Sequence, residues 1–440
     1  MSLPRPTWPA PVLGAAAVAV LLAACSGGAP GADSADPASP ADDGTGEVEL
    51  ADSLTLWGAQ ETPDVVTELV DRYGQERGVD VEFVTVPGPF DQNVLTRWTT
   101  GDRPDVMFFQ PASWRLRQLQ VDNLQPLDDL GLEERQRFDL TGESGSVDGV
   151  QYAATFGFPA VFGVFYNRAV FEEQDLQPPT TYEEFLDVAR TLDEAGVDPV
   201  HLAGGEPWTL QLGPFEWLTD AAADGLVEDI NANEAEWTDE RVVESFERLR
   251  TLVGEGLVND DHTTATYVDQ QQALVSGEAG MVIQASWIVP ALTGSQGEEA
   301  VDSVGYFPMP NESGAVMWQA SNLGSAVLPR TGDPAAEATA RDFLTWLTTD
   351  AYPDYLEGTG EPSVFSDVED PPLDDLTSEV VEAFEAESIP SLTLQAAADY
   401  GPLAPNLGEL VAGVRDPQGV AEAMQTEFAR NAEASGLDGW

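Results

Sequence analysis

The sequence predicts an α/β protein in which strands and helices alternate, and three observations support that fold class. Short apolar runs, some with a period of two, recur from residue 53 onward. Between them lie longer segments in which apolar residues repeat every three or four positions, as on one face of a helix. Glycine and proline mark the junctions. Strand–helix–strand spacing of this kind predicts parallel strands joined by right-handed crossovers.

The clearest alternation comes first along the chain. Residues Ser53–Trp57 predict a strand. Thr62 followed by Pro63 predicts the cap and first position of a helix that ends at Gly78. The elements expected next are a strand at 79–83, a helix at 92–100 and a strand at 105–109.

The remaining elements follow less regularly. Thr181 and Glu184 have the spacing of a capping box, which predicts a helix that runs to Ala195 and is ended by Gly196. The other predicted strands are 161–166, 200–203, 279–284, 304–307 and 323–328. The other predicted helices are 210–223, 240–255, 267–276 and 334–347, with mainly helical structure after residue 350.

The N-terminal segment predicts export. Arg5 is the only charged residue among residues 1–24, and an apolar run with the length of a signal-peptide core extends from Val12 to Ala24. Leu22-Ala23-Ala24-Cys25 is similar to the bacterial lipobox, in which the cysteine becomes lipidated. We therefore expect residues 1–24 to be a lipoprotein signal peptide and Cys25 to be the lipidation site. Residues 25–51 lack aromatic side chains and any apolar periodicity, and they predict a disordered tether.

The chain is strongly acidic. It has 78 aspartate and glutamate residues against 18 basic residues, all of them arginine, and a formal net charge of −60. This charge argues against nucleic acid and anionic lipid surfaces as partners. The two histidines, His201 and His262, lack metal-ligand spacing, and no common catalytic motif is present. We expect no metal, no cofactor and no enzymatic activity.

Six sequence blocks occur in an order typical of one protein family. They are Leu54–Trp57, Thr100–Val106, Asp148–Tyr152 with Gly157–Pro159, Phe165–Arg168 with Phe171 and Pro178–Phe185, Ser276–Met281 with Ser286-Trp287, and Val304–Pro310. Together they resemble the extracellular solute-binding proteins of ABC importers, specifically family 1, the carbohydrate-binding group that is similar to maltose-binding protein. The resemblance covers nearly the whole chain after Cys25.

The resemblance implies a periplasmic-binding-protein-like fold of type II, with two α/β lobes, a ligand cleft and hinge crossovers. Lobe 1 is expected at 52–163 and 307–349, and lobe 2 at 164–306 and 350–436. The resemblance also implies a monomeric, lipid-anchored protein that captures a mono- or oligosaccharide and delivers it to the permease subunits of an ABC transporter. We expect it on the outer face of the cell membrane, or in the periplasm of a Gram-negative cell.

A sugar site needs aromatic rings for the flat sugar faces and planar polar side chains for the hydroxyls. Residues of both kinds follow the predicted strands, where α/β sheets bind ligands. The resemblance implies sugar contacts by Glu206 and Trp208, which match a Glu-Pro-aromatic triplet. It also implies stacking by Trp287, although Ala285 replaces a glycine of that motif. The expected ligand-binding residues are Trp57, Gln60, Phe109, Gln110, Phe158, Glu206, Trp208, Trp287, Trp318 and Asn322.

Other interpretations remain open from the sequence. Each of these tryptophans could belong to the core instead, and Trp98, Trp114, Trp217 and Trp346 are expected to pack because they lie in helical patterns. The same fold could bind a polyamine, which would suit acids such as Glu206, or a polyol phosphate, which would need arginine. A lipid-anchored glycoside hydrolase would need two carboxylates about 5–10 Å apart beside a groove.

Overall fold

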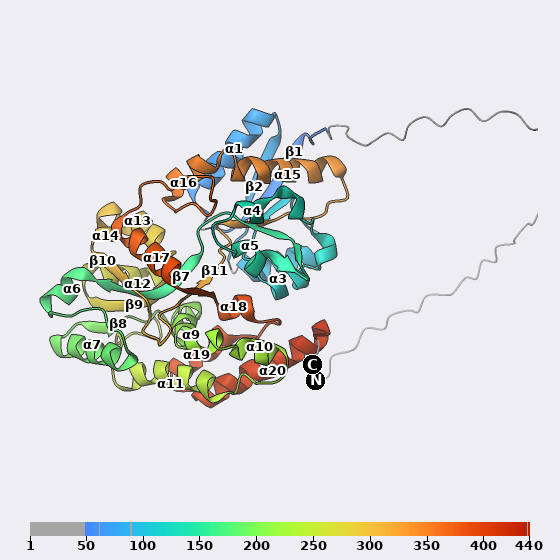
Figure 1. Ribbon diagram of the computed structural model, residues 1–440. Coiled ribbons are helices and arrows are strands. Elements are labelled where there is room, and N and C mark those ends of the chain that lie inside the picture. The colour runs from blue at the N-terminus through green and yellow to red at the C-terminus, as the bar shows by residue number, and fades with distance from the viewer. Residues whose placement is uncertain (1–48, 61, 89, 438) are drawn as a thin grey trace, which may run out of the picture. The chain divides into compact units, whose positions relative to one another are not determined.

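Two β-sheets, each covered by helices, organise the chain (Figure 1). The computed structural model describes residues 49–60, 62–88, 90–437 and 439–440. The predicted signal peptide, Cys25 and the tether up to residue 48 lie outside the described residues. Among the described helices, none combines the length and the apolar character needed to cross a membrane.

The first sheet has the strand order β2-β1-β3-β12-β6. Its strands are β1 (Ser53–Gly58), β2 (Asp80–Thr85), β3 (Val106–Phe108), β6 (Ala153–Thr155) and β12 (Ser325–Val327). The expected parallel pairing is confirmed, since β1 runs parallel to both β2 and β3. β12 returns from far along the chain and pairs antiparallel with β3 and β6.

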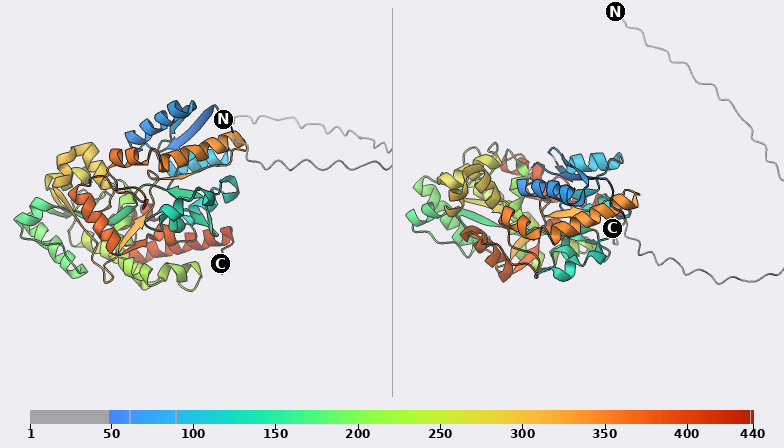
Figure 2. Two further views of the ribbon diagram at one scale, coloured as in Figure 1. Left: turned by 45° about the horizontal axis from the view of Figure 1, so that its top comes forward. Right: turned by 90° about the horizontal axis from the view of Figure 1, so that it is seen from above.

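Successive side chains of β1 point to opposite faces of this sheet and therefore pack in two separate parts of the core. Leu54 and Leu56 pack on one face with α1 (Asp64–Arg77), α15 (Pro334–Thr348) and α16 (Tyr352–Thr359). Trp57 points to the other face, toward α2 (Phe90–Thr99) and α3 (Ser113–Gln118). Figure 2 shows α1 beside α15, although they are far apart in the sequence. The Tyr73 hydroxyl joins them by donating to the backbone carbonyl of Thr339 at 3.2 Å.

The second sheet has the order β13-β11-β7-β9-β8, with β10 also paired to β7. Its strands are β7 (Ala160–Asn167), β8 (Asp198–Val200), β9 (Ala279–Ala285), β10 (Val304–Phe307), β11 (Val316–Gln319) and β13 (Ser388–Pro390). β8 and β9 are parallel, so their carboxyl ends lie at the same edge of the sheet. That edge carries the loops that begin at His201 and Ser286.

Helices cover this second sheet and connect its strands (Figure 1). They are α6 (Arg168–Glu173), α7 (Tyr182–Ala195), α8 (Leu212–Glu216), α9 (Thr219–Ala223), α10 (Leu226–Asn231), α11 (Glu240–Gly254), α12 (Tyr267–Ser276), α13 (Ile288–Gln296), α14 (Glu298–Asp302), α17 (Asp375–Ala386), α18 (Leu392–Gln395), α19 (Leu403–Val411) and α20 (Pro417–Ser435). The short elements α4 (Leu132–Arg135), α5 (Leu140–Gly145), β4 (Ser146–Val147) and β5 (Val150–Gln151) precede β6.

Helix capping follows the sequence in one case and departs from it in another. The Thr181 side chain accepts a hydrogen bond from the backbone N–H of Glu184, and α7 ends at Ala195 as expected. The prediction that Thr62 caps α1 was wrong, because Pro63 is the cap residue and the helix begins at Asp64. The helix expected at 210–223 is also divided, into a 3-10 turn at Pro207–Gln211 followed by α8 and α9.

The chain crosses between the two sheets at 156–159, 320–324 and 360–374. The first two crossings touch, because the backbone N–H groups of Phe156 and Gly157 both donate to the carbonyl of Gly324. A Cβ on Gly157 would lie 2.6 Å from the Gly324 Cα, and the reverse distance is the same. Glycine at both positions therefore allows the two crossings to lie side by side.

Sheet membership differs in places from the expected division into lobes. β11, which the expected boundaries assign to lobe 1, pairs with β7 and β13 in the second sheet. α16, which they assign to lobe 2, packs against α1 and α15. The reason is that the chain returns to the first sheet only at β12 and leaves it only after α16. The lobe boundaries themselves stay a prediction.

Candidate functional site

An aromatic cluster lies at the carboxyl ends of β8 and β9. The Trp208 ring lies 5.9 Å from the Trp287 ring and 5.2 Å from the Tyr267 ring, both in edge-to-face arrangements. Trp287 also packs edge-to-face on Phe162 at 5.9 Å. Trp208 is 37% exposed, whereas Trp287 and Tyr267 are half-buried. The cluster therefore consists of one exposed ring, Trp208, that packs edge-to-face against the half-buried rings of Trp287 and Tyr267.

Close backbone packing holds the loop that carries Glu206 and Trp208. The N–H groups of Gly204 and Gly205 donate to the carbonyls of His262 and Ala265, each at 2.9 Å. A Cβ on Gly204 would lie 2.3 Å from the His262 carbonyl oxygen, so only glycine allows this approach. The loop is thereby fixed against residues 259–266, which lead into α12 and Tyr267.

Trp287 is positioned beside the first crossing between the sheets. The preceding residue, Ser286, donates its backbone N–H to the Val161 carbonyl at 2.9 Å and accepts the Val161 N–H on its hydroxyl at 3.1 Å. The Ser286 hydroxyl also donates to the Pro159 carbonyl at 3.4 Å. Pro159 lies in the segment that enters the second sheet from the first. The cluster is therefore on the side of the second sheet where the two sheets are joined.

Glu206 supplies the charge in this cluster. Its carboxylate accepts long hydrogen bonds from the Trp208 indole N–H at 3.3 Å and from the Tyr267 backbone N–H at 3.4 Å. Burial raises the pKa of Tyr267 above its ordinary value, and the charge of Glu206 acts in the same direction. The Tyr267 hydroxyl is buried and has no hydrogen-bond partner among the described residues. A carboxylate beside an open indole can accept a hydrogen bond from a hydroxyl of a ligand stacked on the ring.

The structure brings together three of the expected residues, namely Glu206, Trp208 and Trp287. The four expected from the first sheet lie at the carboxyl ends of β1 and β3. Trp57 is 2% exposed, and the Arg97 guanidinium lies 4.4 Å from its ring centre. Phe109 is 3% exposed in the same core cluster. Gln110 is half-buried, and the exposed Gln60 accepts the Gly88 N–H at 3.4 Å.

Of the remaining three expected residues, Phe158 and Asn322 lie at the crossings, and Trp318 lies in β11 just before the second crossing. Phe158 and Trp318 both pack edge-to-face against Phe384 of α17, at 5.2 and 6.4 Å. Trp318 is 4% exposed, while Phe158 and Asn322 are half-buried. Trp318 is paired with Val161 of β7, and the part of all three residues in ligand binding stays a prediction. Of the four tryptophans expected to pack, Trp98, Trp217 and Trp346 are buried, and Trp114 is half-buried against the core of the first sheet.

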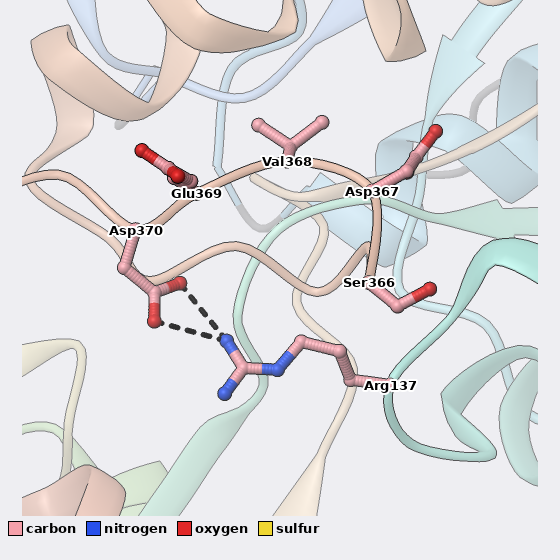
Figure 3. A pocket seen from close by; sticks show the side chains of 6 residues that line it. All are labelled: Arg137, Ser366, Asp367, Val368, Glu369 and Asp370. Atoms are coloured by element: carbon pink, nitrogen blue, oxygen red, sulfur yellow. Dashed lines mark hydrogen bonds and ion pairs between the residues drawn. The ribbon is translucent and has the colours of Figure 1, made fainter.

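A separate hollow of about 600 Å³ lies beside the third crossing (Figure 3). Arg137 and residues 366–370 line it. The Arg137 guanidinium lies 2.9 and 3.0 Å from the two carboxylate oxygens of Asp370 and also donates to Glu385. Its charge is therefore matched within the protein, and none of the expected ligand residues lines the hollow.

Tyr267 was not among the expected residues. It occupies the first turn of α12, whose capping box formed by Thr266 and Asp269 indicates a helix and gives no sign of a ligand site. One available signal was the position of Tyr267 directly after a loop, since Glu206 and Trp208 also lie in a loop region. Its proximity to Trp208 depends on the contact between two loops about 60 residues apart, which no local pattern reports.

Comparison with known proteins places the chain in a family. Residues 59–352 match the family described as bacterial extracellular solute-binding protein. A multiple sugar-binding protein from Streptococcus mutans is 26% identical over 216 residues, which are 46% of this chain and 49% of that protein. The chain thus matches about half the length of this relative.

Solved structures share the fold at low sequence identity. A chitin oligosaccharide binding protein aligns over 87% of this chain and 99% of its own, with a TM-score of 0.76 and 20% identity. A sugar transporter from Bacillus licheniformis, in complex with stachyose, aligns over 86% and 99% with a TM-score of 0.68 and 18% identity. The two-lobed, periplasmic-binding-protein-like α/β fold expected from the sequence is confirmed. The chain belongs to the bacterial extracellular solute-binding protein family.

Proposed function

We propose that this protein captures a mono- or oligosaccharide between its two lobes and delivers it to the permease subunits of an ABC importer. The observation that carries the proposal is the Trp208 ring, 37% exposed and backed by Trp287 and Tyr267 at the edge where the sheets are joined. Sugar relatives and sugar-bound structural neighbours support the same class of ligand.

The chemistry of the cluster suits a sugar. An exposed indole face can stack on the flat apolar face of a pyranose ring. The Glu206 carboxylate retains acceptor capacity, because its two contacts at 3.3 and 3.4 Å are long and a carboxylate has about four lone-pair sites. Ligand stacking and hydroxyl recognition would thus come from adjacent residues of one loop.

The first lobe would complete the site from across the cleft. Gln60 and Gln110 follow β1 and β3 and would offer amide groups to hydroxyls. Trp57 and Phe109 are buried in the core beside the first sheet, so ligand contact by either ring would require the side chains around it, such as Arg97 over Trp57, to move. Phe158, Trp318 and Asn322 would border the cleft at the crossings. Closure would be stabilised only by the ligand's higher affinity for the closed state.

The protein is extracytoplasmic by family, and the finer location is part of the proposal. Cys25 would be lipidated and would hold a monomeric binding protein near its importer, since a flexible tether raises local concentration. A Cys25→Ser variant should then appear in the culture medium or periplasm instead of the membrane fraction. Retention of that variant in the membrane would contradict lipid anchoring at Cys25.

A ligand screen by thermal unfolding tests the function. Ligands that bind the folded state raise its melting temperature by mass action. The screen would compare raffinose, stachyose, chitin oligosaccharides, spermidine and glycerol phosphate. We expect a shift with at least one sugar, and the sugar should be recovered uncleaved because the protein does no bond chemistry. A shift with spermidine alone, or cleavage products, would contradict the proposal.

A further inference from the structure

A chain of buried amide side chains runs behind Trp287. The Trp287 indole N–H donates to the Gln284 side-chain oxygen at 2.9 Å. The Gln284 amide nitrogen donates to the Gln270 oxygen at 2.7 Å, and the Gln270 nitrogen donates to the His201 backbone carbonyl. Gln284 is fully buried and Gln270 is 2% exposed. The two glutamines of this amide chain, Trp287–Gln284–Gln270–His201, therefore lie within the protein, away from solvent.

The direction of every hydrogen bond in the amide chain is fixed. An indole N–H can only donate, so Gln284 must turn its oxygen toward Trp287. The Gln284 nitrogen then faces Gln270, which must present its own oxygen. The Gln270 nitrogen in turn meets the His201 carbonyl, which can only accept. Reversing either amide would bring two donors or two acceptors together in a buried place, at the loss of about 1–3 kcal/mol for each unpaired group.

The amide chain joins all the segments that carry the aromatic cluster. Its first member is Trp287 itself. Its last acceptor, His201, follows β8 and begins the loop that carries Glu206 and Trp208. Gln270 lies three residues after Tyr267 on α12, so the two side chains leave the helix on neighbouring positions. Three separate segments are thereby held in one mutual arrangement.

Packing alone does not require amides at these positions. All seven residues of β9 are buried, and Gln284 is the only polar one among them. An unbranched apolar side chain such as methionine would fill similar space without polar groups that need partners. What the amides add is a fixed direction for the indole N–H and hence for the plane of the Trp287 ring.

We propose that Gln284, supported by Gln270, is a positioning residue that orients the Trp287 ring, against which the ligand-stacking Trp208 ring packs. The inference rests on the proposed function, because it assigns the two glutamines a purpose in binding. It differs from a role in folding, which would lower stability without a specific effect on affinity. The two roles can be separated by experiment.

The test compares Gln284→Met and Gln270→Met with a matched control, Gln125→Met. Gln125 is a buried glutamine, 4% exposed, whose side chain donates to the Pro329 carbonyl at 3.2 Å, far from the cluster in the sequence and beside the first sheet. Affinity would be measured by calorimetry with whichever of raffinose, stachyose or chitin oligosaccharide shifts the wild-type melting temperature most. All measurements would be made well below the melting temperature of the least stable variant.

A second measurement reports the indole directly. In a ¹H–¹⁵N spectrum of the whole protein, the indole resonance that disappears in Trp287→Phe belongs to Trp287. In Gln284→Met this resonance should move toward the position of an unbonded indole and exchange faster with solvent. In Gln270→Met it should move less, because Gln284 remains but has lost its support. In Gln125→Met it should stay in place.

We expect Gln284→Met to weaken sugar binding by about tenfold or more, equivalent to ~1.4 kcal/mol, and Gln270→Met by about threefold. Gln125→Met should leave the affinity within about twofold of wild type even if its melting temperature falls. Binding by Gln284→Met within twofold of wild type would overturn the inference, as would an equal loss in Gln125→Met. If wild type binds none of the three sugars, the proposed function fails and this inference fails with it. If wild type binds and Gln284→Met binds equally well, the inference fails alone.

Discussion

At the scale of single residues, Trp208 has the most unusual environment in the candidate site. Among the described residues, the large apolar side chains that are exposed are Trp208, Val268 and Val414, and Trp208 is the one aromatic ring among them. Under the proposed function, a bound ligand would cover this ring.

The variant Trp208→Ala tests that explanation. It should weaken sugar binding at least tenfold, equivalent to ~1.4 kcal/mol, because the open stacking face is lost. The melting temperature without sugar should also fall by a few degrees, because the edge-to-face contacts with Trp287 and Tyr267 are lost. Val414→Ala, which truncates a side chain that is 76% exposed, is the matched control and should bind like wild type. Unchanged calorimetric affinity in Trp208→Ala would show that this ring is not part of the site.

Glu216 gives a prediction about pH. It is fully buried at the end of α8, and burial raises its pKa to about 8, while the backbone N–H groups of Met309 and Met317 act in the opposite direction. The folded pKa lies above the unfolded value. The folded state therefore keeps a proton that the unfolded state has already lost, and the contribution of Glu216 to stability falls as pH rises from about 4.5 to about 8.

Urea unfolding of wild type and Glu216→Gln measures this contribution. The amide cannot ionise, so subtracting the variant removes the pH dependence of all other groups. Between pH 5 and 7.5 the free energy of unfolding of wild type minus that of the variant should fall by up to ~1.4 kcal/mol per pH unit. A constant difference over this range would mean that Glu216 titrates normally in the folded protein.

At the scale of elements, the loop after β8 depends on glycine. A Cβ on Gly204 would lie 2.3 Å from the His262 carbonyl oxygen, so Gly204→Ala must push the loop away from residues 259–266. That movement displaces Glu206 and Trp208 relative to Tyr267. We expect sugar affinity to fall about tenfold or more by calorimetry.

The control for this variant is Gly254→Ala, at the end of α11, where a Cβ would have no neighbour within 4 Å. It should bind normally and be equally or more stable, because alanine suits a helix better than glycine. Equal affinity of Gly204→Ala and wild type would show that the loop tolerates the displacement, and that its contact with residues 259–266 does not set the site.

Elements with strong local signals were predicted from the sequence. α7 and α12 match their expected bounds because capping residues and apolar periodicity agree. β11 and β13 were not predicted, since each is three or four residues long and depends on pairing with strands distant in the sequence. The Gly157–Gly324 contact between the crossings is likewise a tertiary feature that neither residue's neighbours indicate.

The candidate site was also predictable only in part, because some of its residues follow a local rule and others depend on tertiary contacts. Glu206, Trp208 and Trp287 follow strands whose carboxyl ends share an edge, and that rule places them together. Trp57 and Phe109 also follow strands, but their side chains point into the core on the α2 side. Strand ends alone do not show which way the last side chain points. Tyr267 and Gln284 belong to the site through contacts that only the fold creates.

At the scale of the whole molecule, the most prominent feature is the large negative net charge. With 78 acidic residues against 18 arginines, the folded chain must hold many like charges close together. Most of the described arginines pair with acids, as Arg135 does with Asp367 and Arg168 with Glu379, but they neutralise only a small part of the acidic charge. Salt shortens the screening length from about 10 Å at 0.1 M to about 3 Å at 1 M.

The melting temperature should therefore rise as KCl is increased from 0.05 to 1 M, by on the order of 5 °C. Screening of repulsion should outweigh the weakening of surface ion pairs, which contribute little individually. Sucrose at the same osmolality is the control, because it adds no screening. A melting temperature that falls with KCl would mean that the ion pairs matter more than the net charge.

The central claim is that a carbohydrate binds against the Trp208, Trp287 and Tyr267 cluster between the two lobes. A crystal structure of the protein with a sugar identified by the thermal screen tests it most directly. We expect a sugar ring stacked on the Trp208 face, a sugar hydroxyl bonded to Glu206, and groups from the first sheet on the opposite side. A sugar bound elsewhere, with the Trp208 face still open, would contradict it.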